Sequence, residues 1–221
     1  MREAYHVELE ELAGNLAGMS VQVANAMERA TEALLNADLS LAEQVIGEDA
    51  KIDDARAECE EQAYALLALQ APVATDLRTV LAVIHAAESL ERMGDLALHV
   101  AKAARRRHPH NALPEPVRPY FAEMGEAVVK LALRTEEVIK SRDVEAARSL
   151  EADDDQVDEI HRHLFSVIMA KDWEFGVPAA VDVTLLGRFY ERYADHAVSV
   201  AKRMVFVATG KMPGYGADED V

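Results

Sequence analysis

The sequence predicts an all-α protein of six long helices, arranged as two tandem three-helix bundles. Hydrophobic residues make up 50% of the 221-residue chain but aromatic residues only 5%, a composition typical of helical proteins. Apolar residues recur with helical periodicity over long stretches that few breakers interrupt. The run Glu91 to Lys102 recurs one hundred residues later as Glu191 to Lys202, with seven of twelve positions identical. The chain is therefore an internal duplication.

Three helices are expected in the first half, over residues 3–36, 39–70 and 73–107. The turn at 36–38 interrupts the first periodic stretch. Ser40, with Glu43 three residues further on, then predicts a capping box at the start of the second helix. Pro72 ends that helix and suits the first turn of the third. Helices of this length joined by short turns pack antiparallel, so this half should be one bundle.

The second half repeats this plan, with helices expected over residues 117–140, 143–173 and 178–209. Four prolines between His108 and Pro119 exclude a helix interior there. The segments 141–143 and 176–178 break the pattern again. We therefore divide the chain into a first repeat (1–108), a Pro-rich connection (109–116), a second repeat (117–209) and a disordered tail (210–221).

Composition excludes several classes of function. A net charge of -17 and the lack of a basic stripe argue against nucleic acid as a partner. No apolar run approaches the roughly 20 residues that span a bilayer. A single cysteine, Cys59, excludes an internal disulfide. We expect a soluble, cytoplasmic protein.

Paired carboxylates recur in both halves. Glu91 and Asp95 lie four residues apart, which places both on one face of a helix. A helical wheel puts that face within the apolar stripe, near Val80, Ile84 and Leu98. The same reasoning applies to the second helix of each half, where further acidic pairs align at an offset of 105 residues. Each half thus directs four carboxylates toward a shared groove: Asp49, Asp53, Glu91 and Asp95 in the first, and Asp154, Asp158, Glu191 and Asp195 in the second.

Four carboxylates that converge on an apolar-flanked groove repel one another and lose hydration, so an opposite charge is needed. One candidate is a set of nearby protein cations: Arg56, His161, Lys102 and Lys202. The other is bound metal. An all-carboxylate set suits Mg, Ca, Mn or iron, whereas a zinc site more usually contains Cys or several His.

Two segments of the first half carry a family resemblance. Residues 70–78 (QAPVATDLR) followed by 90–95 (LERMGD) resemble the signature of the PhoU family, and residues 190–196 (YERYADH) are similar to that family's repeat of it. PhoU proteins are cytoplasmic accessory and signalling proteins of the bacterial high-affinity phosphate transport system. The resemblance covers nearly the whole chain.

The resemblance implies a homodimer with metal clusters in each bundle's acidic groove, held by the eight carboxylates above. Iron, zinc, manganese and magnesium are the candidate ions. It further implies a negative regulator that contacts the ATPase subunit of the phosphate ABC transporter and a sensor histidine kinase, and meets the membrane only through the transporter. Nothing in the sequence demands catalysis, so we expect an adaptor and not an enzyme.

Two alternatives remain open. A helical-bundle carboxylate metalloenzyme of the di-iron kind needs a Glu-x-x-His motif on each of two helices. Here only Asp158-x-x-His161 approaches it, with Arg56 at the duplicate position. The other alternative is a structural bundle without any ion, in which removing carboxylates would stabilise the fold.

Overall fold

The structure, a computed structural model, describes residues 2–211. It consists of helices throughout, with no strand among these residues. No helix in this part of the chain has the length and apolar character needed to cross a membrane. The helices are α1 (Arg2–Asn36), α2 (Leu39–Glu48), α3 (Ala50–Gln70), α4 (Ala74–Arg107), the short 3-10 helix η1 (Glu115–Val117), α5 (Arg118–Ser141), α6 (Val144–Ile168) and α7 (Gly176–Thr209).

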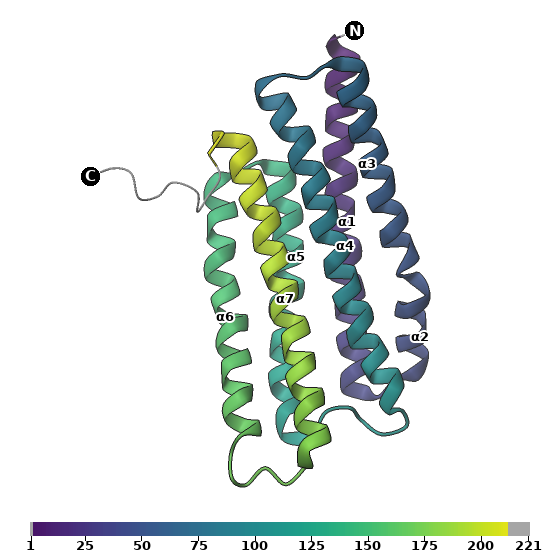
Figure 1. Ribbon diagram of the computed structural model, residues 1–221, viewed down its shortest axis with the longest axis vertical. Helices are drawn as coiled ribbons and strands as arrows, with labels where there is room; N and C mark the ends of the chain where they lie inside the picture. Colours follow the sequence, from purple (N-terminus) through teal and green to yellow (C-terminus); the bar gives the residue numbers. More distant parts are fainter. Residues whose placement is uncertain (1, 212–221) are drawn as a thin grey trace, which may run out of the picture.

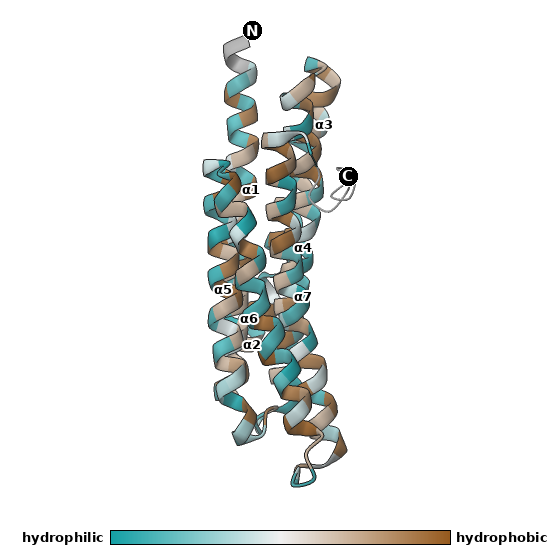
Figure 2. Ribbon diagram, turned by 90° about the vertical axis from the view of Figure 1, so that its left-hand side faces the viewer, coloured by the Kyte–Doolittle hydropathy of each residue, from teal (hydrophilic) through white to brown (hydrophobic). Residues whose placement is uncertain are grey.

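The predicted tandem bundles are confirmed. Helices α1, α4, α5 and α7 lie side by side along the long axis, with α2 and α3 on one flank and α6 on the other (Figure 1). The first bundle comprises α1 to α4, and the second comprises α5 to α7. Buried residues from both bundles form a single apolar cluster, and hydrophilic residues are spread over the outer faces of the helices (Figure 2). The two repeats therefore share one core.

The expected helix over 39–70 is divided, which corrects the prediction. It runs as α2 and α3, which meet at Asp49. Asp49 keeps helical dihedral angles (φ -54°, ψ -40°), but the amide of Ile52 donates to its carbonyl at 2.9 Å, a three-residue step that tightens the helix locally. The capping box at Ser40 is also wrong. Asp38 is the N-cap, and its carboxylate accepts from the amide of Leu41 at 3.0 Å.

The ends of the last two helices also differ from expectation. The helix expected over 143–173 ends at Ile168, and the last helix begins at Gly176 instead of 178. The Trp173 indole donates to the Gly176 carbonyl at 3.0 Å and so closes the connecting loop. Proline at the start of a helix is tolerated because the first-turn amides have no partner within the helix, so Pro178 lies inside α7. Of the predicted tail, residues 212–221 lie outside the described part.

Polar contacts join the two repeats inside the molecule. The hydroxyls of Thr31 on α1 and Tyr190 on α7 are hydrogen-bonded at 2.7 Å, and both are buried. At one end of the molecule, Asp182 on α7 is only 6% exposed. Arg106 donates to its carboxylate at 3.1 Å, and the Nε of Arg107 donates at 2.7 Å. The end of α4 is thus tied to the start of α7.

Candidate functional site

A close helix approach creates the first acidic groove. Gly94 lies on α4 between Glu91 and Asp95, and a Cβ at this position would stand 3.0 Å from Cδ1 of Ile52 on α3. Without a side chain at Gly94, α3 packs directly on α4 at this level. The carboxylates on both sides of the junction are consequently brought together.

Electrostatics show that the four first-half carboxylates are neighbours. The pKa of Asp49 is raised by burial and then by the charges of Asp53 and Asp95. Burial, Asp95 and Asp53 likewise raise the pKa of Glu91, against the opposing effect of Arg92 and Arg56. Both shifts mean that the ionised carboxylates raise the energy of the fold. The carboxylates that the helical wheel places on one side of the bundle are therefore close enough for their charges to act on one another.

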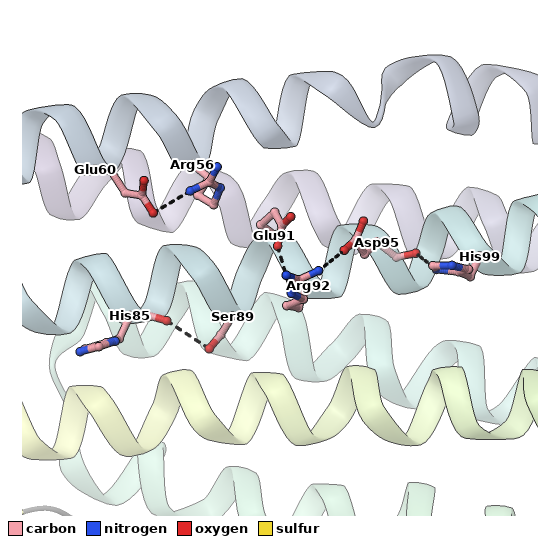
Figure 3. Close-up of polar contacts among 8 residues, drawn as sticks. All are labelled: Arg56, Glu60, His85, Ser89, Glu91, Arg92, Asp95 and His99. Atoms are coloured by element: carbon pink, nitrogen blue, oxygen red, sulfur yellow. Dashed lines mark hydrogen bonds and ion pairs between the residues drawn. The ribbon is translucent and has the colours of Figure 1, made fainter.

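Arg92 supplies the counter-charge that the sequence reasoning missed. Its Nη1 donates to Oδ2 of Asp95 at 2.7 Å, and its Nε lies 3.5 Å from Oε2 of Glu91 (Figure 3). Arg56, which was expected to offset these charges, pairs with Glu60 at 2.7 Å (Figure 3) and acts on Glu91 and Asp53 only through its charge. Lys102 acts on Asp49 only through its charge. The available signal was the position of Arg92, one residue after Glu91 and three before Asp95.

The second-half carboxylates are less well compensated. Burial, followed by the charges of Asp158 and Asp195, raises the pKa of Asp154 to about 6. Burial and Asp195 also raise the pKa of Glu191, although Arg188 pairs with it. Asp154 Oδ1 and Glu191 Oε2 are buried and have no hydrogen-bond partner among the described residues. Buried carboxylate oxygens of this kind need a cation or a proton.

His161 lies beside the second groove and does not serve as a counter-charge. Its Cδ2 would stand 3.0 Å from a Cβ at Gly187, and its ring packs on Phe165 with centroids 5.1 Å apart. Burial, aided by Arg188, lowers the pKa of His161 below its usual 6.5. The imidazole is therefore neutral at pH 7, and its Nε2 has no hydrogen-bond partner in the described part. Lys202, another expected counter-charge, pairs with Glu151 at 2.8 Å.

The ligand atoms that the grooves offer are of the type that hard cations prefer. Each groove offers carboxylate oxygens, the ligands that Mg, Mn and ferric or ferrous iron accept, and the second groove adds a neutral imidazole. As their side chains lie, the described residues contain no group of three or more His, Cys, Asp or Glu close enough together to hold a metal ion. The fit thus rests on the donor chemistry and on the unpartnered buried oxygens.

The fold and the two grooves define a duplicated, all-helical protein with one candidate cation-binding surface in each repeat. Comparison with known proteins agrees with this class. The PhoU domain matches the chain twice, over residues 16–104 and 121–204, so each structural repeat corresponds to one copy of the domain. The chain belongs to the PhoU family, whose members are regulatory accessory proteins and not enzymes.

Relatives of known name and structure cover almost the entire chain. It is 58% identical over 213 residues to the phosphate-specific transport system accessory protein PhoU homolog 1 of Mycobacterium leprae, covering 96% of each protein. Homolog 2 of Mycobacterium tuberculosis is 57% identical, with 96% of this chain and 100% of the relative covered. The crystal structure of the phosphate transport system regulatory protein PhoU from Streptococcus pneumoniae superposes with a TM-score of 0.86 at 26% identity, covering 94% of this chain and 98% of that one.

Proposed function

We propose that this protein regulates phosphate transport in the cytoplasm. It acts as an adaptor between the ATPase subunit of the phosphate ABC transporter and a sensor histidine kinase, and as a homodimer it keeps the phosphate-starvation response off when phosphate is plentiful. The double match to the PhoU domain carries this proposal. Full-length relatives named for the phosphate-specific transport system support it.

Metal binding is the second part of the proposal. The first-half and second-half carboxylates would each hold divalent or ferric ions, with iron, manganese, magnesium and zinc as candidates. Burial and then mutual repulsion raise the pKa values of Asp49, Glu91, Asp154 and Glu191, and a bound cation would offset both effects. In the second groove, Asp154 Oδ1 and Glu191 Oε2 would become ligands. His161 is the histidine that we propose as an additional, imidazole ligand of the second groove.

A carboxylate metalloenzyme, the alternative considered from sequence, is not supported. The family is one of regulatory proteins. Arg56, which pairs with Glu60, occupies the position in the first repeat that is equivalent to His161. The first repeat therefore has no histidine there, and the pair of Glu-x-x-His motifs of di-iron proteins is incomplete.

Co-purification tests the adaptor role. The full chain, tagged at its N-terminus, is purified from cells grown in high phosphate, and the transporter ATPase and the histidine kinase are sought by mass spectrometry. A gene deletion is examined in parallel with a phosphate-starvation reporter. We expect both partners in the purified complex and a reporter that is switched on in the deletion strain. A silent reporter, together with the absence of both partners, would contradict the proposal.

A further inference from the structure

A groove between α4 and α7 gathers positive charge in an otherwise acidic protein. It has a volume of about 350 Å³ and lies where the two repeats meet. Asp95 is the single acidic residue that lines it, against three arginines and two histidines, in a chain whose net charge is -17. We call it the α4–α7 groove, and its lining residues are Arg92, Asp95, Leu96, His99, Arg188, Phe189, Arg192 and His196.

The duplication explains why the arginines meet. In a helix, successive residues are rotated by about 100°, so the arginine that follows Glu91 or Glu191 points away from the carboxylate's direction. The third helices of the two repeats, α4 and α7, lie side by side. Arg92 and Arg192, which occupy equivalent positions, therefore line the same groove from opposite helices. Burial, followed by the charges of Arg192 and Arg92, lowers the pKa of His196 against the opposing charges of Asp195 and Glu88, so both arginines lie near this ring.

The charges in this groove are only partly compensated. Arg92 is held by Asp95, and Arg188 is paired with Glu191. Arg192 has no hydrogen bond or ion pair with any residue that the structure describes. Arg192 therefore brings a positive charge to the groove without a carboxylate to pair with it, which favours an anion there.

The groove also has a defined wall. The rings of His99 and Phe189 pack across it with centroids 5.3 Å apart. Nδ1 of His99 lies 2.7 Å from the carbonyl oxygen of Asp95, which fixes the ring. In Figure 3, Arg92 and His99 lie along the same stretch of α4 as Asp95, next to α7. The cationic side chains thus surround a space that is shaped by packed rings.

We propose that the α4–α7 groove binds a phosphate-sized oxyanion through Arg92, Arg188 and Arg192. Guanidinium groups donate two parallel hydrogen bonds to phosphate oxygens, which gives strength and geometric selectivity. Inorganic phosphate and a small phosphate monoester present the same chemistry to these donors. The groove shares Asp95 with the carboxylates proposed to hold metal, but its anion-binding groups are guanidinium groups, so we expect binding without metal.

Calorimetric titration of inorganic phosphate into the full chain, at low ionic strength and with a chelator present, tests this proposal. We expect saturable binding by the wild type. Arg192→Gln should weaken it by about tenfold or more, because hydrogen bonds to a charged partner are lost. Arg192→Lys, which keeps the charge but not the paired donors, should fall between the two. Arg162→Gln, at an exposed position on α6, makes the same change in net charge and should bind as the wild type does.

Further titrations distinguish free phosphate from a phosphate monoester as the ligand. Saturable binding of glycerol phosphate without binding of free phosphate would identify a monoester as the ligand of this site, provided that Arg192→Gln abolishes it. The proposal is overturned if the wild type binds neither, or if Arg192→Gln and Arg162→Gln bind equally well. It is also overturned if phosphate binds only with added metal and binding is lost in Asp49→Asn, Asp154→Asn but not in Arg192→Gln. That last result would leave the metal proposal standing.

Discussion

Asp154 shows most directly how the acidic grooves lower the stability of the folded protein. Burial and four neighbouring carboxylates raise its pKa to about 6, from an ordinary value of 3.8. A raised carboxyl pKa means that the folded protein holds this proton more tightly than the unfolded chain does. Stability in the absence of metal therefore falls as pH rises from about 4 to about 6, and stays lower above that range.

Replacing Asp154 should therefore stabilise the metal-free protein. We expect Asp154→Asn to raise the free energy of unfolding at pH 7.5 by about 1 to 2 kcal/mol, a figure reduced from the full shift because the side chain is partly exposed to solvent. The gain should disappear below pH 4. Urea denaturation in chelator across a pH series measures both effects. Glu159→Gln, at an exposed position on the same helix, is the control. An Asp154→Asn variant less stable than the wild type at pH 7.5 would contradict this explanation.

At the scale of single residues, the sequence predicted that Glu91 and Asp95 share one face of their helix, but not that Arg92 pairs with them. Helical spacing fixes which way Glu91 or Asp95 points, because the backbone sets the direction of the Cβ. A long arginine side chain has several rotamers and can pair with any of several carboxylates within reach. Arg56 pairs with Glu60, one turn along its own helix, whereas Arg92 pairs with Asp95 in the groove. Sequence spacing alone does not distinguish these outcomes.

Among the helices, the prolines and the duplication predicted where most elements begin and end. The break at Asp49 had no such signal, since neither proline nor glycine occupies that position and its dihedral angles stay helical. The loop after α6 was also missed, because the residues from Met169 to Trp173 contain no breaker. There the helix ends where the connecting segment closes through Trp173 and Gly176.

Gly94 controls how closely α3 and α4 pack, and its replacement tests that contact. Gly94→Val should lower the free energy of unfolding by about 1 to 3 kcal/mol, since even a Cβ would stand 3.0 Å from Cδ1 of Ile52. Gly18→Val on α1 is a matched control, because no atom lies within 4 Å of a Cβ there and valine is not a worse helix former than glycine. Thermal unfolding followed by circular dichroism compares the two variants. Equal stability would show that α3 does not approach Gly94 so closely.

For the whole molecule, the shared core is the feature that makes two repeats one protein. Thr31 and Tyr190 hydrogen-bond across the boundary between them, and the Tyr190 ring packs edge-on against Phe121 with centroids 5.7 Å apart. Tyr193, one helical turn further on, is equally buried, but its hydroxyl has no hydrogen-bond partner in the part of the chain described. The pair offers a matched test of the contact.

Tyr190→Phe should cost about 1 kcal/mol of unfolding free energy, because a buried hydrogen bond between the repeats is lost. Tyr193→Phe removes a buried hydroxyl that has no hydrogen-bond partner among the described residues, so it should leave the free energy of unfolding unchanged or increase it. Guanidinium denaturation of both variants measures the difference. A greater loss of stability in Tyr193→Phe than in Tyr190→Phe would contradict this role of the Thr31–Tyr190 hydrogen bond.

Metal analysis of the tag-free protein shows whether the two acidic grooves bind metal, as we propose. Wild type is compared by plasma mass spectrometry with the variant Glu91→Gln, Asp95→Asn, Glu191→Gln, Asp195→Asn, and with a control that neutralises four exposed carboxylates elsewhere: Glu11→Gln, Glu61→Gln, Asp172→Asn and Glu174→Gln. We predict several metal ions per chain in the wild type and the control, and their loss in the groove variant. A well-folded wild type that carries no metal and takes up none of the added iron, manganese, magnesium or zinc would contradict the claim.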